Sequence, residues 1–244
     1  IRFYGLEAML SGADACRAHG MRYVPETGAP LVLVPHRRRA PSSGLAVVRR
    51  VTAVPVARTV SGLAVAPVER AVVDALRRSP RAATEPSLRD TRALVCESVQ
   101  RRLTTPERLS AEVMAAPRNG TRLLRRALAD VTAGCWSAPE CEIRDLARTS
   151  HLLPDPVVNT PLPGLDDITP DGWWLEARLA YEVDSAEHHR YGLSPEHTQR
   201  RHARTASAGW RVMPISPRRI RTDPHGLLRE MEAAYLRGLA DHAA

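Results

Sequence analysis

The sequence predicts an α/β protein, because of two observations about the order of its patterns. Over residues 135–244 the periodicity runs helix, strands, helix, strand, helix, which is typical of a central sheet with helices on both faces. Over residues 1–134 a few short β-like runs come first, and segments of helical period follow. We therefore expect a small mixed lobe plus a helical region in the first part, and a mixed sheet flanked by helices in the second.

The first part begins with a short helical stretch, LSGADACRAHG from Leu10, and two β-like runs, LVLVP from Leu31 and LAVVRRVTAV from Leu45. From Pro67 the period changes, because apolar residues recur at i, i+3, i+4 and i+7 with breakers between the segments. Amphipathic helices are expected in PVERAVVDALRR, SLRDTRALVCESVQRRL, TPERLSAEVMAAP and GTRLLRRALADVTAG. Thr105 precedes a proline and an acidic residue, which is typical of an N-cap.

The second part opens on Ser137-Ala-Pro-Glu140, which has the form of a capping box. Ser137 would cap a helix that runs to about Ser150, and Glu140 would bond back to the Ser137 amide. The elements expected next are strands in VVNTPLP and RLAYEVD, a helix over about 194–207, a strand in WRVMPIS and a helix in DPHGLLREMEAAYLRGLADH. The four tryptophans, Trp136 included, are expected to pack in the core.

The composition excludes several classes of protein. A chain of 244 residues with 43% hydrophobic content can bury a real core, and no apolar run approaches the roughly 20 residues that span a bilayer. No segment has the form of a signal peptide, so we expect a cytoplasmic protein without a membrane partner. The first residue is Ile1, so the question of a preceding segment stays open. The four cysteines match no zinc or disulfide pattern and are expected to be buried thiols.

The charge indicates a polyanionic partner. The formal net charge of +8 favours nucleic acid, and we expect DNA. All 35 basic residues are arginine, a composition that is also typical of a GC-rich genome, yet each guanidinium can bind phosphate through two hydrogen bonds. The basic turn from His36 to Arg39 is a candidate phosphate contact, and an ordinary basic turn is the alternative.

Acidic residues surround an apolar strand in PDGWWLEARLAYEVDSAEHH, residues 170–189. Carboxylates beside such a strand cost free energy unless a cation compensates them. Ten residues separate Asp171 from Glu182, which is enough for a turn and a strand that returns both to one end of the sheet. Such a pair suits Mg²⁺ or Mn²⁺. Glu182 and Asp184 would share one strand face, with Tyr181 on the other. The alternative is a solvated strand edge with an arginine partner.

The segment Pro170-Asp171, ten residues, then Glu182-Val183-Asp184 resembles the PD-(D/E)xK nuclease signature. The neighbouring motifs are S-x-x-E from Ser137, D-x-W-W from Asp171, E-V-D-S from Glu182 with His189 after it, T-x-x-R from Thr198, and G-W at Gly209. This set resembles the very-short-patch-repair-like endonuclease domain that ends many actinobacterial proteins. In the first part, LSGADACRAHG, LVLVP and ERAVVDALRR resemble the antitoxin of the AbiE abortive-infection system.

The resemblance implies a restriction-endonuclease-like sheet with assigned catalytic roles. Asp171 and Glu182 would hold Mg²⁺ or Mn²⁺, and Glu140, from the flanking helix, would assist. His189 would be a base or proton donor near neutral pH.

The resemblance also implies a DNA-facing helix and a departure from the signature. The arginines that would face the DNA backbone are Arg200, Arg201 and Arg204. The lysine of the full signature falls at Asp184, and the chain contains no lysine. The very-short-patch-repair branch also lacks this lysine and relies on histidine, so Asp184 with His189 would take its place.

Two functions therefore compete. The first is a metal-dependent DNA endonuclease in which Asp171 and Glu182 bind the ion and Arg201 steadies the developing charge. The second is a catalytically inactive DNA-binding regulator of antitoxin type, with a toxin or another protein as partner. Acids that converge on one point favour the enzyme, and arginine side chains that fill this space favour the regulator.

Overall fold

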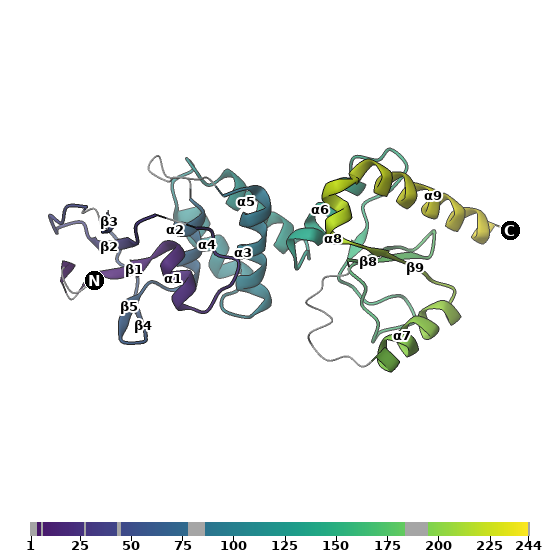
Figure 1. Cartoon of the computed structure of the whole chain (residues 1–244), viewed down its shortest axis with the longest axis horizontal. Helices are drawn as coiled ribbons and strands as arrows, with labels where there is room; N and C mark the ends of the chain where they lie inside the picture. The colour runs from purple at the N-terminus through teal and green to yellow at the C-terminus, as the bar shows by residue number, and fades with distance from the viewer. Residues whose placement is uncertain are drawn as a thin grey trace. The chain divides into compact units, whose positions relative to one another are not determined.

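The structure is a computed structural model of the whole chain, and it describes residues 4–5, 7–26, 28–42, 45–77, 86–183 and 195–243. The chain splits into two compact units, Ile1–Ala133 and Gly134–Ala244 (Figure 1). This division lies beside the boundary that the sequence suggested near Gly134. The predicted fold class is confirmed: the described residues form a mixed α/β protein with one five-stranded and one four-stranded mixed sheet.

The sheet of the N-terminal unit has the strand order β3-β2-β1-β5-β4. Pairing is antiparallel between β1 and β2 and between β4 and β5, and parallel between β2 and β3 and between β1 and β5. The strands are β1 (Met9–Ser11), β2 (Leu31–Pro35), β3 (Val47–Val51), β4 (Arg58–Val60) and β5 (Leu63–Val65). The sequence predicted β2 and β3, while β1, β4 and β5 escaped prediction because three residues are too few for an alternating pattern.

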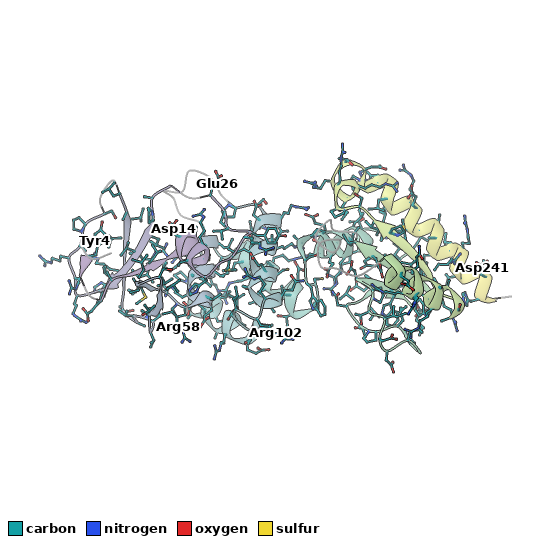
Figure 2. All side chains as sticks on the ribbon, turned by 60° about the horizontal axis from the view of Figure 1, so that its bottom comes forward. Tyr4, Asp14, Glu26, Arg58, Arg102 and Asp241 are labelled. Atoms are coloured by element: carbon teal, nitrogen blue, oxygen red, sulfur yellow. The ribbon has the colours of Figure 1, made fainter. Side chains whose placement is uncertain are left out.

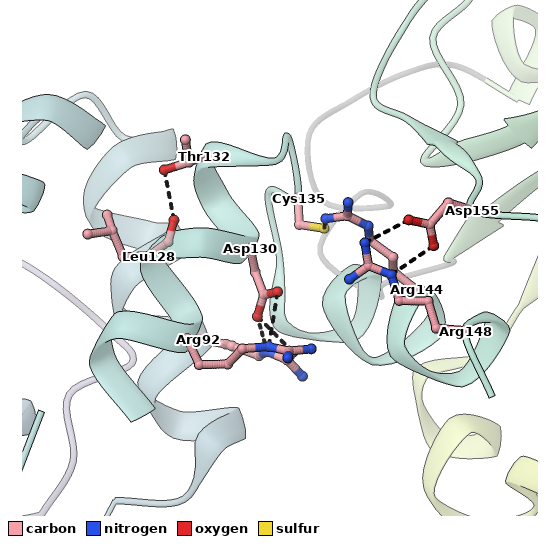
Figure 3. Close-up of polar contacts among 9 residues, drawn as sticks. Arg92, Leu128, Asp130, Thr132, Cys135, Arg144, Arg148 and Asp155 are labelled. Atoms are coloured by element: carbon pink, nitrogen blue, oxygen red, sulfur yellow. Dashed lines mark hydrogen bonds and ion pairs between the residues drawn. The ribbon is translucent and has the colours of Figure 1, made fainter. Parts of the chain in front are cut away.

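The helices of the N-terminal unit are α1 (Gly12–Ala18), α2 (Val68–Leu76), α3 (Leu88–Gln100), α4 (Pro106–Ala115) and α5 (Arg122–Thr132). Each lies within a segment whose period predicted a helix. The N-cap at Thr105 is confirmed, because its hydroxyl accepts a hydrogen bond from the Arg108 amide at 3.3 Å. Helices α3 and α5 are joined by a buried ion pair between Arg92 and Asp130, with Nη2 2.7 Å from Oδ2 (Figure 3).

A second buried charge links the sheet to α2. The Asp74 carboxylate accepts hydrogen bonds from the Ser11 hydroxyl at 2.7 Å, from Arg70 Nε at 2.8 Å and from Arg49 Nη1. Because a buried carboxylate without partners is costly, the bonds from Ser11 and Arg49 fix β1 and β3 to α2, and Arg70 adds a bond within the helix (Figure 2 shows the side chains of this unit).

The C-terminal unit has the strand order β6-β7-β8-β9, in which β8 and β9 are parallel and the other pairs antiparallel. Its elements are α6 (Ala138–Ala147), β6 (Val157–Val158), β7 (Gly172–Trp174), β8 (Leu179–Val183), α7 (Pro195–Ser207), β9 (Arg211–Ile215), α8 (Pro217–Thr222) and α9 (Pro224–Ala243). Helices α7 and α9 lie on opposite sides of β8 and β9 (Figure 1).

Each face of this sheet has its own apolar cluster. Trp174 and Tyr181 are buried together with residues of α6, α8 and α9, and their ring centroids are 5.5 Å apart. Trp173, Ala180 and Trp210 are buried on the other face, where the two indole rings meet edge to face at 5.7 Å. The alternation along β7 and β8 therefore follows the period of a strand.

The expectation of a tryptophan core is correct for three of the four residues. Trp136 is the exception, with 51% of its surface exposed. No helix among the described residues has the length and apolar character needed to cross a membrane.

Candidate active site

The hairpin formed by β7 and β8 places Asp171 across from Glu182. Gly172 pairs with Tyr181 in this antiparallel ladder, so the next position outward pairs Asp171 with Glu182. Asp171 directly precedes β7, and Glu182 is the fourth residue of β8. Directly opposite residues project to the same face, so both carboxylates lie at one end of the sheet.

Asp171 is held by the backbone of β8 and sits among other acids. Its Oδ2 accepts a hydrogen bond of 2.6 Å from the Val183 amide. Burial, and after it the charges of Glu140 and Glu182, raise the pKa of Asp171 to about 7, although the Val183 amide and Arg201 act in the opposite direction. Within the described residues no hydrogen bond to Oδ1 occurs. The carboxyl is therefore about half protonated at neutral pH without an added cation.

Glu140 belongs to the first turn of α6 and reaches back past the helix cap. The Ser137 hydroxyl accepts from the Glu140 amide at 3.3 Å, as a capping serine does. The expected return bond from the Glu140 carboxylate to the Ser137 amide is wrong. Glu140 Oε2 instead accepts hydrogen bonds from the Trp136 amide at 2.9 Å and from Asn159 Nδ2 at 2.7 Å. These two donors take the place of the Ser137 amide.

Asn159 is a site residue that the sequence analysis missed. Its side chain donates to Glu140 and also to the Gly134 carbonyl at 2.8 Å, while its own amide donates to the Asp171 carbonyl at 3.3 Å. Asn159 therefore ties α6 to the residue at the start of β7. Its backbone has a φ of 46°, which asparagine tolerates better than most residues. An asparagine after a short β-like run indicates a turn, and nothing in the pattern indicates its partners.

Arg201 pairs with Glu182. Its Nη2 lies 2.5 Å from Glu182 Oε1 and donates to the Thr169 carbonyl at 3.3 Å. The pair is partly exposed, at 28% for the arginine side chain and 27% for the glutamate. One of the two expected metal ligands therefore has an arginine partner, and Arg201 contacts protein oxygens where the resemblance places DNA phosphate.

The other two arginines of α7 also have acidic partners. Arg200 pairs with Glu196 one turn earlier at 2.7 Å, and both side chains are exposed. Arg204 contacts both oxygens of Asp167, with Nη2 2.8 Å from Oδ1. Exposed pairs of this kind contribute little to stability, so a phosphate can compete for the guanidinium groups.

Asp171 and Glu182 have the carboxylate oxygens that a divalent cation prefers. The described residues do not provide a complete set of ligands for such an ion. Within the described ranges no three His, Cys, Asp or Glu side chains converge as ligands of one metal ion. Asp171 and Glu182 supply the hard oxygen donors that Mg²⁺ prefers, and the raised pKa of Asp171 reflects its burial first and the charges of Glu140 and Glu182 second. Asp184 and His189 lie outside the described residues.

Tyr181, Gly172 and Cys135 are buried residues of the same unit as these acids. Tyr181 is buried, its hydroxyl has no partner among the described residues, and burial raises its pKa above the ordinary range. Gly172 packs so closely that a Cβ there would lie 2.3 Å from Tyr181 Cζ. The four cysteines are buried as expected. Hydrogen bonding to Cys141 and burial raise the pKa of Cys135, which disfavours the thiolate form of this cysteine.

Two arginines near the end of α6 contact other side chains of this unit: Arg144 lies in the helix, and Arg148 is its C-cap (Figure 3). Arg144 places Nη1 3.9 Å from Cys135 Sγ. Arg148 binds Asp155 through two hydrogen bonds of 2.7 and 2.8 Å, and these lower the pKa of Asp155.

No family model, curated protein or solved structure matches the chain. The resemblance to the very-short-patch-repair-like endonucleases and to the AbiE antitoxin therefore stays a prediction from the motifs.

Proposed function

We propose that the C-terminal unit is a metal-dependent DNA endonuclease of the very-short-patch-repair-like class, which hydrolyses phosphodiester bonds. The observation that carries the proposal is the placement of Asp171 opposite Glu182, where burial and then the charges of Glu140 and Glu182 raise the pKa of Asp171 to about 7. A mixed sheet with helices on both faces is the arrangement that the motif resemblance implies.

The proposed roles follow from the contacts of each residue. Asp171 and Glu182 would hold Mg²⁺ or Mn²⁺, which when bound supplies an activated water and neutralises charge on phosphate. Glu140, fixed by Asn159, would contribute negative charge beside the ion. His189 would accept or donate the proton, with Asp184 beside it, and both assignments come from the motif. Arg201 would leave Glu182 for the scissile phosphate, because a partly exposed pair is weak.

The alternative function is a catalytically inactive DNA-binding regulator of antitoxin type, with a toxin or other protein as partner. One observation favours it: Arg201 supplies Glu182 with a counterion from within the protein. In this alternative the nuclease-like unit is a scaffold, and the acids have no metal to hold. Both functions place the protein in the cytoplasm with its DNA.

Cleavage of a plasmid and of labelled oligonucleotides in Mg²⁺ or Mn²⁺ tests the proposal. Wild type should cleave, and Asp171→Ala and Glu182→Ala should each lose at least about 100-fold in rate, since each removes a proposed ligand. Glu176→Ala is the matched control, because Glu176 is an exposed acid in the turn at the other end of the same hairpin. Full cleavage by both site variants would remove these acids from the mechanism, and no cleavage by wild type would favour the regulator.

A further inference from the structure

The positive charge of the protein belongs to one unit. Residues 1–133 contain 22 arginines and 11 acidic residues, a formal net charge of +11. Residues 134–244 contain 13 arginines and 16 acidic residues, a formal net charge of −3. The unit with the candidate active site is therefore slightly acidic, and the attraction for a polyanion comes from the N-terminal unit.

Part of this charge gathers at one corner of the N-terminal sheet. Strands β2 and β3 lie side by side at the sheet edge, with Val34 paired to Arg50 and Pro35 to Val51 (Figure 1). The His36 amide donates to the Val51 carbonyl at 2.8 Å, so the basic turn leaves β2 beside the end of β3. We define the arginine corner as Arg37, Arg38, Arg39 and Arg50, all of which are exposed.

The arginine corner has more positive charge than its acidic neighbour can neutralise. Glu7 contacts both Arg37 and Arg38. Within the described residues neither Arg39 nor Arg50 has an acidic partner. Four guanidinium groups against one carboxylate leave a local charge of +3.

The neighbouring residue on β3 shows that this exposure is selective. Arg49 precedes Arg50, pairs with the buried Asp74 and has 27% of its side chain exposed. Successive residues of a strand point to opposite faces, so β3 commits one arginine to the core and presents the next to solvent. Arg49 therefore points towards Asp74, and Arg50 points towards solvent, although the two residues are adjacent in the sequence.

We infer that the arginine corner binds the phosphodiester backbone of duplex DNA. Guanidinium groups bind phosphate oxygens bidentately, and contacts of this kind carry affinity without sequence information. Tyr4, whose carbonyl accepts a hydrogen bond from Arg38 at 3.4 Å, has a buried side chain and so offers no ring on which unpaired bases could stack, which favours a duplex over a single strand. That the polyanion is DNA rests on the proposed function. The exposed positive charge of the corner does not depend on the proposed function.

Binding by the full chain to a fluorescein-labelled duplex, measured by fluorescence anisotropy in EDTA over a range of NaCl concentrations, tests the inference. Two lost phosphate contacts reduce the slope of log K against log salt by about 2 and weaken binding about 30-fold at about 0.15 M salt. This is the expected effect of the double variant Arg39→Ala with Arg50→Ala. The control is Arg108→Ala with Arg122→Ala, which removes the same charge from exposed positions on α4 and α5. The control should weaken binding less than about threefold.

Each outcome decides the inference once circular dichroism shows that both double variants are folded. Unchanged binding by the corner variant would overturn it, and so would an equal loss in the control, because the total charge would then explain the affinity. Corner-dependent binding of single-stranded DNA or of RNA in preference to the duplex would also overturn it. Glu176→Ala, which changes neither a corner arginine nor a proposed metal ligand, should bind like wild type. Lost cleavage with intact corner-dependent binding, or the reverse, separates the failure of the proposed function from failure of this inference.

Discussion

Replacement of Asp171 by asparagine should change how the stability of the C-terminal unit depends on pH. In the folded protein burial, Glu140 and Glu182 raise the pKa of this carboxyl from its ordinary value of 3.8 to about 7. A carboxyl with a raised pKa binds its proton more tightly in the folded state. The contribution of this carboxyl to the free energy of unfolding is therefore fully present below pH 3.8 and is lost as the pH rises through about 7.

The size of the effect follows from the two pKa values. Between about pH 5 and pH 8 the unfolded carboxyl is ionised throughout, while the folded carboxyl goes from protonated to ionised, which costs about 3 kcal/mol. The amide of the variant would stay neutral and still offer an oxygen to the Val183 amide. Relative to wild type, the free energy of unfolding of Asp171→Asn should therefore be about 3 kcal/mol more favourable at about pH 8 than at about pH 5.

Urea unfolding followed by tryptophan fluorescence measures this difference. All four tryptophans lie at or beyond residue 136, so the signal reports the C-terminal unit alone. Glu176→Gln is the control, since it removes an exposed acid from the same hairpin and should show no pH-dependent gain. An equal difference between Asp171→Asn and wild type at both pH values would refute the reasoning, because it would mean that Asp171 titrates normally.

Four further predictions concern the same unit. At about pH 8, Mg²⁺ at about 100 times its Kd should stabilise wild type by about 2.7 kcal/mol and leave Asp171→Asn unchanged, and equal stabilisation of both would contradict a site at this residue. Tyr181→Phe should stabilise by about 1 kcal/mol, because a buried hydroxyl without a partner among the described residues is removed, and a loss would reveal a partner. Gly172→Ala should cost about 1–3 kcal/mol in urea unfolding, because the new Cβ meets the Tyr181 ring, and no cost would mean that the strands can separate freely. Asn159→Gly should cost about 1–2 kcal/mol through lost hydrogen bonds to Glu140 and Gly134, and Asn159→Ala more, because only glycine adopts a φ of 46° without strain; equal costs would refute the strain argument.

Local signals predicted much of the fold. The helices α2 to α6 follow from the recurrence of apolar residues and from caps such as Thr105 and Ser137, since a helix and its N-terminus depend on neighbours within one or two turns. The proximity of Asp171 and Glu182 follows from a spacing that fits one hairpin. Such inferences need only short-range geometry, and that is why they were possible.

The contacts of the site depend on tertiary structure and could not be read from the pattern. Glu140 had the spacing of a capping box, but Asn159, from a distant segment, competes for its carboxylate. The sequence predicted that Arg201 faces DNA phosphate together with its neighbours on the helix. In the folded unit α7 packs so that Arg201 pairs with Glu182 instead. The charge contrast between the units was available in the sequence, and it becomes visible only when the charges are counted by unit.

The choice between enzyme and regulator depends on whether arginine neutralises the acids, and the C-terminal unit contains its own comparison. Asp155 has a true arginine counterion: two hydrogen bonds from Arg148 lower its pKa. Asp171 lies near Arg201 and shows the opposite pKa shift, because burial and two further acids outweigh that single guanidinium. A scaffold gains nothing from a carboxyl held in this state, since a neutral asparagine would keep the Val183 hydrogen bond without the cost at neutral pH. A bound cation would offset this cost, and that is the physical argument for proposing the metal-dependent enzyme rather than the regulator.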